Sequence, residues 1–240
     1  MRDLQRLSDN VRTSELAPLR VAATLTLASV LLPDAITRFH RELPEVSMDL
    51  LAMHSREMLD YLLLRDIDIG LTLQEVNHPG LQMEIIGQGW LQVIAPPGWW
   101  SEEQLQTPQQ LSALAGAPMI GITVKDDLGR RIHIHLESLT PEPNIRMWVQ
   151  TYQLARALVR DGHGLALVDS FTARGHGNDA LQFRTLEPVL PIPLYAVYRK
   201  GEPLDHAQRR FLAHVREHAR LANHAEHEDR ADPSGPPRTR

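Results

Sequence analysis

The spacing of apolar residues in the first third of the chain predicts alternating strands and helices. Residues 19–24 form a short apolar run typical of a buried strand, and apolar residues then recur at helical spacing over 32–43. Residues 46–53 predict a second strand, 55–63 a helix with one apolar stripe, and 67–71 a third strand. Connections of this β-α-β-α-β kind imply parallel strands with right-handed crossovers.

A second α/β series follows. Residues 81–85 alternate between apolar and polar, and 91–95 form another apolar run that ends at Pro96. The pattern beyond it predicts a helix opened by a capping box at Thr107-Pro108-Gln109-Gln110, strands over 119–122, 145–149, 165–168 and 194–198, and helices over 128–139, 152–160 and 211–219. We therefore expect two α/β lobes joined by a strand-rich connection near 93–97.

The two ends of the chain differ from the middle. Residues 1–17 carry Leu4, Leu7 and Val11 between charged residues, a pattern that predicts a short amphipathic helix. Residues 223–240 contain no aliphatic side chain larger than alanine. Such a segment buries too little apolar surface to offset its ordering entropy, so it is predicted to be disordered.

Charge and composition narrow the function classes. Among 240 residues, 25 Lys and Arg against 30 Asp and Glu give a net charge of −5, so nothing draws the chain to a nucleic-acid backbone or an anionic membrane. The absence of cysteine excludes disulfides, thiolate catalysis and Cys-ligated metal centres. No apolar run reaches the ~18 residues of a membrane span, and the N-terminus lacks the apolar core of a signal peptide. We therefore expect a soluble cytoplasmic protein.

Polar residues that directly follow predicted strands are the strongest candidates for a binding site. In Thr24-Leu25-Thr26 two hydroxyls alternate after the first strand, where the next helix offers unpaired N–H groups suited to a carboxylate, sulfate or phosphate. Thr72, Thr123 and Asp169 follow three other strands in the same way. Four such positions, two in each lobe, suggest a polar cleft, although a threonine there can also simply cap a helix.

Signatures of catalysis and metal binding are weak. The sequence holds no G-x-S-x-G elbow, P-loop or G-x-G-x-x-G motif. Among twelve histidines, His214 and His218 have a workable metal spacing of four, but no acidic partner pattern accompanies them, and we favour solvated surface histidines. The sequence thus predicts no enzyme, no metal site and no cofactor.

Three stretches of the sequence resemble, in the same order, the effector-binding domain of LysR-type transcriptional regulators. They are Leu19–Pro33 with Phe39 and Pro44–Val46 after it, Leu62–Leu71, and Leu158–Val168. The resemblance covers about residues 1–222. It implies an α/β, two-lobed fold of the periplasmic-binding-protein-like (type 2) kind, with a ligand cleft between the lobes.

The resemblance also implies a division of the chain. Residues 18–93 plus 194–222 would form lobe I, and residues 94–193 would form lobe II. Residues 1–17 resemble the end of the linker helix that precedes this domain in family members. Residues 223–240 would remain a disordered tail.

Candidate ligand-binding residues follow from the same resemblance. The family's effector is held by polar groups that fall on Thr24 and Thr26, with Leu25 between them, and on Thr72 and Thr123. To these we add Asp169, because a carboxylate facing the cleft would favour a ligand with an ammonium group.

The implied function is that of an effector-sensing domain that binds a small anionic or zwitterionic metabolite to control transcription. The stretch Val168–Ala173 resembles the branch of the family that senses amino acids and opines. Homodimers or tetramers are expected, and DNA would be bound only through a winged helix-turn-helix that is absent from this chain. Two alternatives remain open: a free-standing small-solute-binding protein of the same fold, and a small-molecule enzyme that uses the same cleft.

Overall fold

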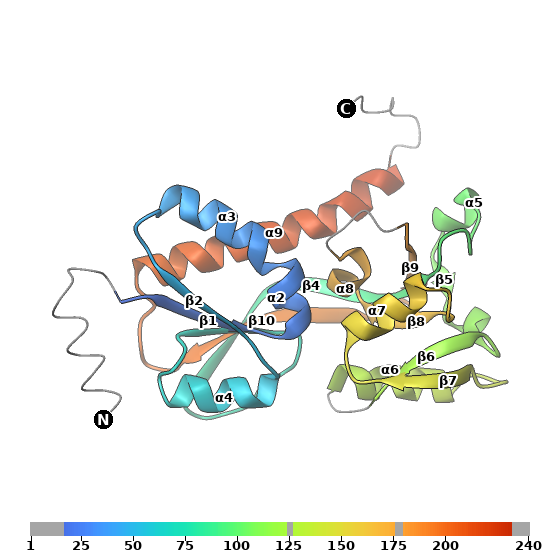
Figure 1. Ribbon diagram of the computed structural model, residues 1–240, viewed down its shortest axis with the longest axis horizontal. Coiled ribbons are helices and arrows are strands. Elements are labelled where there is room, and N and C mark those ends of the chain that lie inside the picture. The colour runs from blue at the N-terminus through green and yellow to red at the C-terminus, as the bar shows by residue number, and fades with distance from the viewer. Residues whose placement is uncertain (1–16, 124–126, 176–179, 232–240) are drawn as a thin grey trace.

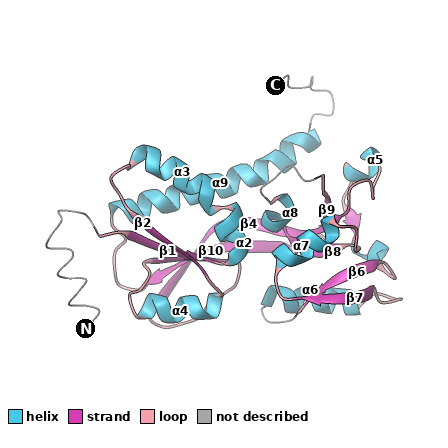
Figure 2. Cartoon of the chain, viewed as in Figure 1, coloured by secondary structure: helices cyan, strands magenta, loops and turns pink. Residues whose placement is uncertain are grey.

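The computed structural model describes residues 17–123, 127–175 and 180–231 (Figure 1). Strands lie in the middle of two lobes, and helices lie above and below them (Figure 2). The linker helix predicted for residues 1–17 falls almost entirely outside the described residues. The two-lobed α/β architecture that the resemblance implies is confirmed.

The first lobe is built on a sheet with strand order β2-β1-β3-β10-β4. Its elements are β1 (Leu19–Ala23), α2 (Leu25–Val30), α3 (Leu32–Glu42), β2 (Met48–Ala52), α4 (Ser55–Leu63), β3 (Ile69–Thr72), β4 (Leu81–Ala95), β10 (Pro191–Arg199) and α9 (His206–Ala231). β1 pairs in parallel with both β2 and β3, as predicted, whereas β10 runs antiparallel to β3 and β4. The carboxyl ends of β1, β2 and β3 therefore meet at one edge of the sheet.

The second lobe continues from the end of β4. Its elements are α5 (Glu102–Leu105), β5 (Gln109–Gln110), a 3-10 turn η1 (Leu111–Leu114), β6 (Pro118–Ile122), α6 (Asp127–Glu137), β7 (Asn144–Val149), α7 (Tyr152–Arg160), β8 (Ala166–Asp169), α8 (Ser170–Arg174) and β9 (Gln182–Glu187). β8 and β9 run antiparallel to β4, and β6 pairs in parallel with β7. A single bridge between Met119 and Leu165 joins β6 to the segment that enters β8.

Strand β4 passes through both lobes, although the sequence predicts two separate runs. It pairs with β10 in its first part and with β8 and β9 from Leu91 onward. Gly87 and Gly89 lie in its middle, where an added Cβ atom would be 3.0 Å from Ala219 on α9 and 2.5 Å from Ser170 on α8. The two glycines weaken the local strand pattern but allow both helices to approach, so tertiary contact makes the strand continuous.

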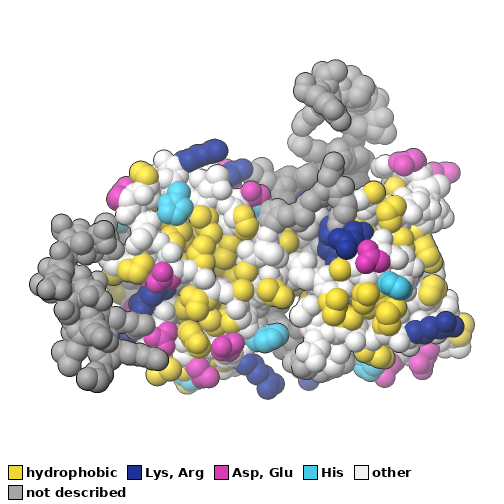
Figure 3. Space-filling model, in the orientation of Figure 1, with side chains coloured by type: hydrophobic (Ala, Val, Ile, Leu, Met, Phe, Trp, Pro, Cys, Tyr) yellow, Lys and Arg dark blue, Asp and Glu magenta, His cyan; other side chains and the backbone are white. Residues whose placement is uncertain are grey.

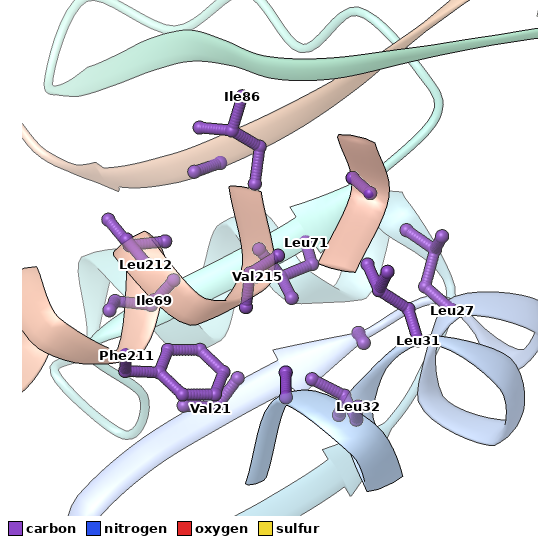
Figure 4. Packing of buried hydrophobic residues seen from close by; sticks show 14 of the residues in the cluster. Val21, Leu27, Leu31, Leu32, Ile69, Leu71, Ile86, Phe211, Leu212 and Val215 are labelled. Carbon is purple, nitrogen blue, oxygen red and sulfur yellow. The ribbon is translucent and has the colours of Figure 1, made fainter. Parts of the chain in front are cut away.

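Helix α9 returns from the end of the chain to complete the core of the first lobe. Its residues Phe211, Leu212 and Val215 pack over the sheet beside Leu71 of β3 (Figure 4). Phe211 also meets Phe39 of α3 edge to face, with ring centroids 5.9 Å apart. Full burial of each such side chain stabilises the fold by about 1.5–3 kcal/mol, so α9 is an integral part of this lobe.

The predicted start of a helix at a capping box on Thr107 is wrong, although the 3-10 turn η1 follows at Leu111–Leu114. Gln109–Gln110 form strand β5 beside β9, and the capping box lies earlier, where Ser101 and Gln104 close the start of α5. Arg184 of β9 donates hydrogen bonds to Thr107 and Pro108 carbonyls and to the Gln109 side chain, which holds this segment extended. A contact across 75 or more residues thus overrides the local helix signal.

The C-terminal segment also differs from its prediction. Helix α9 continues to Ala231, so residues 223–231 are helical where disorder is predicted. Alanine, glutamate and arginine favour the helix, and extending an existing helix adds one hydrogen bond per residue without a new nucleus. Residues 232–240 lie outside the described part of the chain.

Candidate functional site

A cavity of about 530 Å³ lies where the two lobes face each other. Its described lining comes from residues at the carboxyl ends of β1, β2, β3, β7 and β8, with Leu128 of α6: Thr24, Leu25, Thr26, His54, Ser55, Arg56, Leu73, Gln74, Leu128, Gln150, Thr151, Tyr152, Gln153 and Asp169. Ligands of open α/β sheets bind at this end of the strands. The volume falls within the ~300–1,000 Å³ typical of small-molecule sites.

Four helices begin at the wall of this cavity: α2, α4, α7 and α8 (Figure 1). The residues that precede α2 and α4, Thr24 and His54, make no side-chain hydrogen bond to the first helical N–H groups. In α7, by contrast, the Thr151 hydroxyl accepts from the Leu154 N–H at 3.2 Å. The first turns of α2 and α4 therefore present N–H donors and a positive dipole end, an environment that favours an anion.

Of the residues proposed from the sequence, Thr24, Leu25, Thr26 and Asp169 line this one cavity. Thr24, Leu25 and Thr26 come from the first lobe and Asp169 from the second, although more than 140 residues separate them in the chain. The prediction that polar residues at the ends of strands lie near one another therefore agrees with the structure for Thr24, Thr26 and Asp169.

Thr72 and Thr123 do not line the cavity. The Thr72 side chain is fully buried, and its hydroxyl lies 2.8 Å from the Ser55 hydroxyl and accepts from the Gln74 N–H at 3.0 Å. It holds in place two residues that do line the cavity. Thr123 directly follows β6, and its N–H donates to the Val149 carbonyl at 2.7 Å.

Asp169 is fully buried at the start of α8. Its Oδ1 accepts from the Thr172 N–H at 2.8 Å and its Oδ2 from the Thr172 hydroxyl at 2.6 Å, so the carboxyl group caps the helix. Burial raises the pKa of Asp169, against the lowering effect of these hydrogen bonds. Both carboxyl oxygens are engaged by Thr172, so an ammonium group would not meet an otherwise unused carboxylate.

Several lining residues were not proposed from the sequence. Arg56, in the first turn of α4, is the only lysine or arginine among the described residues of the lining. The signal was available, because Gln150 and Thr151 directly follow β7, just as Thr24 follows β1, and Ser55 and Arg56 begin the helix that comes after β2. Applying the same rule to every strand would have found them.

The described residues give no support for a metal site or for a membrane-spanning helix. Within the described ranges, no group of three or more His, Asp or Glu side chains is arranged to hold a metal ion. None of the described helices is both long and apolar enough to cross a membrane.

Known proteins resemble the chain in sequence and in fold. Residues 13–220 match the model of the LysR substrate binding domain. The HTH-type transcriptional regulator DgcR of a Pseudoalteromonas species is 27% identical over 214 residues, which cover 88% of this chain and 72% of that protein. The chain spans between 64% and 72% of the length of the curated relatives that it matches.

Solved structures agree on the fold. The reduced regulatory domain of OxyR from Pseudomonas aeruginosa has a TM-score of 0.69 at 16% identity, covering 83% of this chain and 97% of that one. Full-length CbnR in complex with its target DNA has a TM-score of 0.70 at 21% identity, covering 91% and 80%. Because the family model matches most of the sequence and the fold agrees, the chain belongs to the LysR substrate-binding domain family, whose role is to sense effectors for transcriptional regulators.

Proposed function

We propose that the cavity between the lobes binds a small anionic or zwitterionic effector, with amino acids and opines as the first candidates. The observation that carries this proposal is the cavity wall, where hydroxyl, amide and backbone N–H groups from both lobes converge beside Arg56. A few polar groups that converge in a largely apolar cavity are what a small-ligand site requires.

Two contacts already link the lobes next to the cavity. The Gln153 side chain of α7 donates to the Ser29 hydroxyl of α2 at 3.1 Å, and the Thr172 hydroxyl of α8 lies 3.2 Å from that of Thr26. A ligand that touches α2, α4 and α7 together would stabilise one arrangement of the lobes over others. Effector binding would thereby be converted into a change of shape.

DNA contact and assembly are proposed for the whole regulator. On the face shown in Figure 3, basic and acidic side chains are interspersed, and no large basic patch is visible. We propose that DNA is contacted by a winged helix-turn-helix outside this chain and that the domain assembles as a homodimer or tetramer. We propose that lobe I comprises residues 18–93 plus 194–222 and lobe II residues 94–193. We also propose that the domain binds its effector without converting it.

A thermal-shift screen against amino acids, opines and small carboxylates tests the site. A ligand at a hundred times its dissociation constant adds about 2.7 kcal/mol, or roughly 5–10 °C for a chain of this size. Replacing Thr26 with valine removes one hydroxyl at the wall and should weaken binding by about tenfold or more. The matched control is Thr37→Val, which removes an exposed hydroxyl on α3 that donates to the Pro33 carbonyl. Undiminished binding by Thr26→Val would remove Thr26 from the site.

Arg56 provides a second test. Arg56 is the only lysine or arginine among the described lining residues, so its guanidinium is the side-chain charge available to a carboxylate ligand there. Arg56→Gln should therefore weaken binding of a carboxylate ligand by about tenfold and reduce the dependence of affinity on salt. The control is Arg160→Gln, because Arg160 lies on the surface and pairs with Asp161. Equal losses in both variants, measured by titration calorimetry, would show a general charge effect instead.

A further inference from the structure

The cavity between the lobes has an apolar wall that a carboxylate group alone would not contact. Four large apolar or aromatic side chains contribute to its described lining: Leu25, Leu73, Leu128 and Tyr152. Polar residues are more numerous there, yet the larger part of the cavity surface is apolar. The ligand therefore needs an apolar part to match this surface.

Three of these side chains pack on one hydrophobic cluster. Leu128 of α6 belongs to a core cluster of the second lobe. Leu73 and Tyr152 pack against this same cluster, and Leu73, which follows β3, also packs against the core of the first lobe. Because all three also line the cavity, its apolar wall joins residues of both lobes.

Leu25 adds to this wall from the first lobe. Strands β1 and β3 pair in parallel, and Ala23 and Leu71 are the last partners in their register. Leu25 and Leu73 each lie two residues beyond that pair, at the same end of neighbouring strands. Leu25 is 49% exposed, so a bound ligand can still cover much of its apolar surface.

The Arg56 charge lies close to the apolar wall. The Ser55 hydroxyl is 2.8 Å from the Thr72 hydroxyl, and this contact joins the start of α4 to the end of β3. Arg56 and Leu73 are the residues that directly follow this pair in the chain, and both line the cavity. A carboxylate held at Arg56 would therefore place the carbon atoms attached to it near Leu73.

The size of the cavity also favours a ligand with an apolar body. A volume of about 530 Å³ equals that of about eighteen water molecules at ~30 Å³ each. A very short acid would leave most of this space to water. Water is held well only where about two to four polar partners surround it, and an apolar wall does not provide them. An apolar group that displaces this water gains affinity.

We propose that the effector is a carboxylate with an apolar aliphatic or aromatic body, and that the wall formed by Leu25, Leu73, Leu128 and Tyr152 selects that body. This inference rests on the proposed function, since it takes the cavity to be the effector site. Among amino acids the class is that of leucine and phenylalanine, whereas polar amino acids and polar opines lie outside it. Each buried CH₂ group tightens binding by about fourfold, so the wall can discriminate strongly.

The experiment compares ligands that share a carboxylate and differ in the body attached to it. Dissociation constants are measured by titration calorimetry for acetate, butyrate and hexanoate, and for two pairs of similar shape, L-leucine with L-asparagine and L-phenylalanine with L-histidine. Weakly bound ligands are measured by displacement of hexanoate.

The apolar ligands should bind more tightly. Hexanoate should exceed acetate by at least about tenfold in affinity, and the apolar member of the better-bound pair should exceed its polar partner by at least about tenfold. The tighter ligands should also show a more negative heat-capacity change on binding, because they bury apolar surface.

Two leucine-to-alanine variants and a matched control assign this selectivity to the wall. Leu25→Ala removes a half-exposed side chain from the lining, whereas Leu154→Ala removes one of nearly equal exposure, 50%, from the start of α7 outside the described lining. Leu25→Ala should weaken binding of hexanoate by about fivefold or more and of acetate by less than about twofold. Leu73→Ala should have the same effect, and Leu154→Ala should change neither affinity. Melting temperatures show that each variant is folded.

The outcomes distinguish this inference from the proposed function. If polar and apolar partners bind equally well and binding depends on Arg56, the selection of an apolar body is overturned and the effector site stands. The same follows if polar opines or short polar acids are the only ligands that bind. A preference for apolar ligands that Leu25→Ala and Leu73→Ala leave unchanged overturns the role of the wall. If neither these compounds nor any ligand of the thermal-shift screen binds, the proposed function itself is overturned.

Discussion

Gly164 adopts a backbone conformation that side chains rarely tolerate, and it does so where two strands of the second lobe meet. Its φ angle is +126°, and an added Cβ atom would lie 2.6 Å from the Pro118 carbonyl oxygen. The following N–H, of Leu165, donates to that same carbonyl at 2.9 Å. The glycine thus allows the chain to leave α7 and enter β8 in contact with β6.

Replacing Gly164 with alanine should destabilise the protein by about 2–4 kcal/mol, from backbone strain and from the clash with Pro118. The matched control is Gly98→Ala, where φ is also positive at +76° but nothing lies within 4 Å of the added atom. It should cost about 1 kcal/mol, the backbone part alone. Urea unfolding measures both, and equal losses would contradict the role of the contact.

At the residue scale, the sequence predicted where the cavity would be but not how each side chain would be used. Thr24, Thr26 and Asp169 reach the cavity because the carboxyl ends of β1 in the first lobe and β8 in the second both lie at it. Thr72 occupies the same kind of position, yet its hydroxyl turns inward to Ser55. That choice depends on a partner 17 residues away, which no local pattern shows.

Helices α3 and α9 are joined by ion pairs on the outer side of the first lobe. Glu42 of α3 contacts Arg210 and His214 of α9, and Arg38 contacts Glu217 at 3.0 Å. Hydrogen bonds from Arg210 and then His214 lower the pKa of Glu42 from 4.5 to about 2. The two helices are therefore held together by charge as well as by the core beneath them.

The pH dependence of this contact follows from the lowered pKa. A carboxyl group with a lower pKa in the folded state stabilises the protein above its unfolded pKa, and that contribution is lost as the pH falls. For Glu42 this contribution to stability should be lost as the pH falls from about 4.5 to about 2. Glu42→Gln should therefore lower the urea midpoint at pH 7, and its difference from the native protein should shrink below pH 4.5.

The control for this prediction is Glu45→Gln, an exposed glutamate in the turn that follows the same helix, with no ion-pair partner among the described residues. Its effect should be small at every pH, as for most surface substitutions. A difference between native and Glu42→Gln proteins that stays constant with pH would contradict the role of the ion pair.

At the scale of elements, the sequence predicted the long helices with a regular apolar spacing well, but it did not predict short elements reliably. The apolar stripe of α9 and the helix Tyr152–Arg160 appear as expected, because a long period in the sequence demands one buried face. The segment Gln109–Gln110 is a strand because Arg184 holds it against β9. A capping signal of four residues is too weak to compete with such a contact.

Strand β4 contributes residues to the hydrophobic cores of both lobes. Its residue Ile86 belongs to the core of the first lobe, whereas Leu91 and Val93 belong to a core of the second. Disrupting either lobe therefore disturbs a strand that the other lobe needs. We expect the described chain to unfold as one cooperative unit.

Calorimetry of two core variants tests this cooperativity. Leu71→Ala in the first lobe and Ile120→Ala in the second both remove nearly fully buried side chains, so each should cost about 2–5 kcal/mol. Both should lower the midpoint of a single transition. Two separate transitions, each sensitive to one variant only, would show that the lobes unfold independently.

The sequence by itself determined the alternation of strands and helices in the first third of the chain, the parallel pairing of β1 with β2 and β3, and the strand ends at which polar residues gather. These features follow from periodicity and turn chemistry, which act over a few residues. Only the tertiary structure decided that β4 is shared, that Thr72 turns away from the cavity, and that Asp169 reaches Thr26 through Thr172. Each of these depends on partners distant in the sequence, and packing alone brings such partners together.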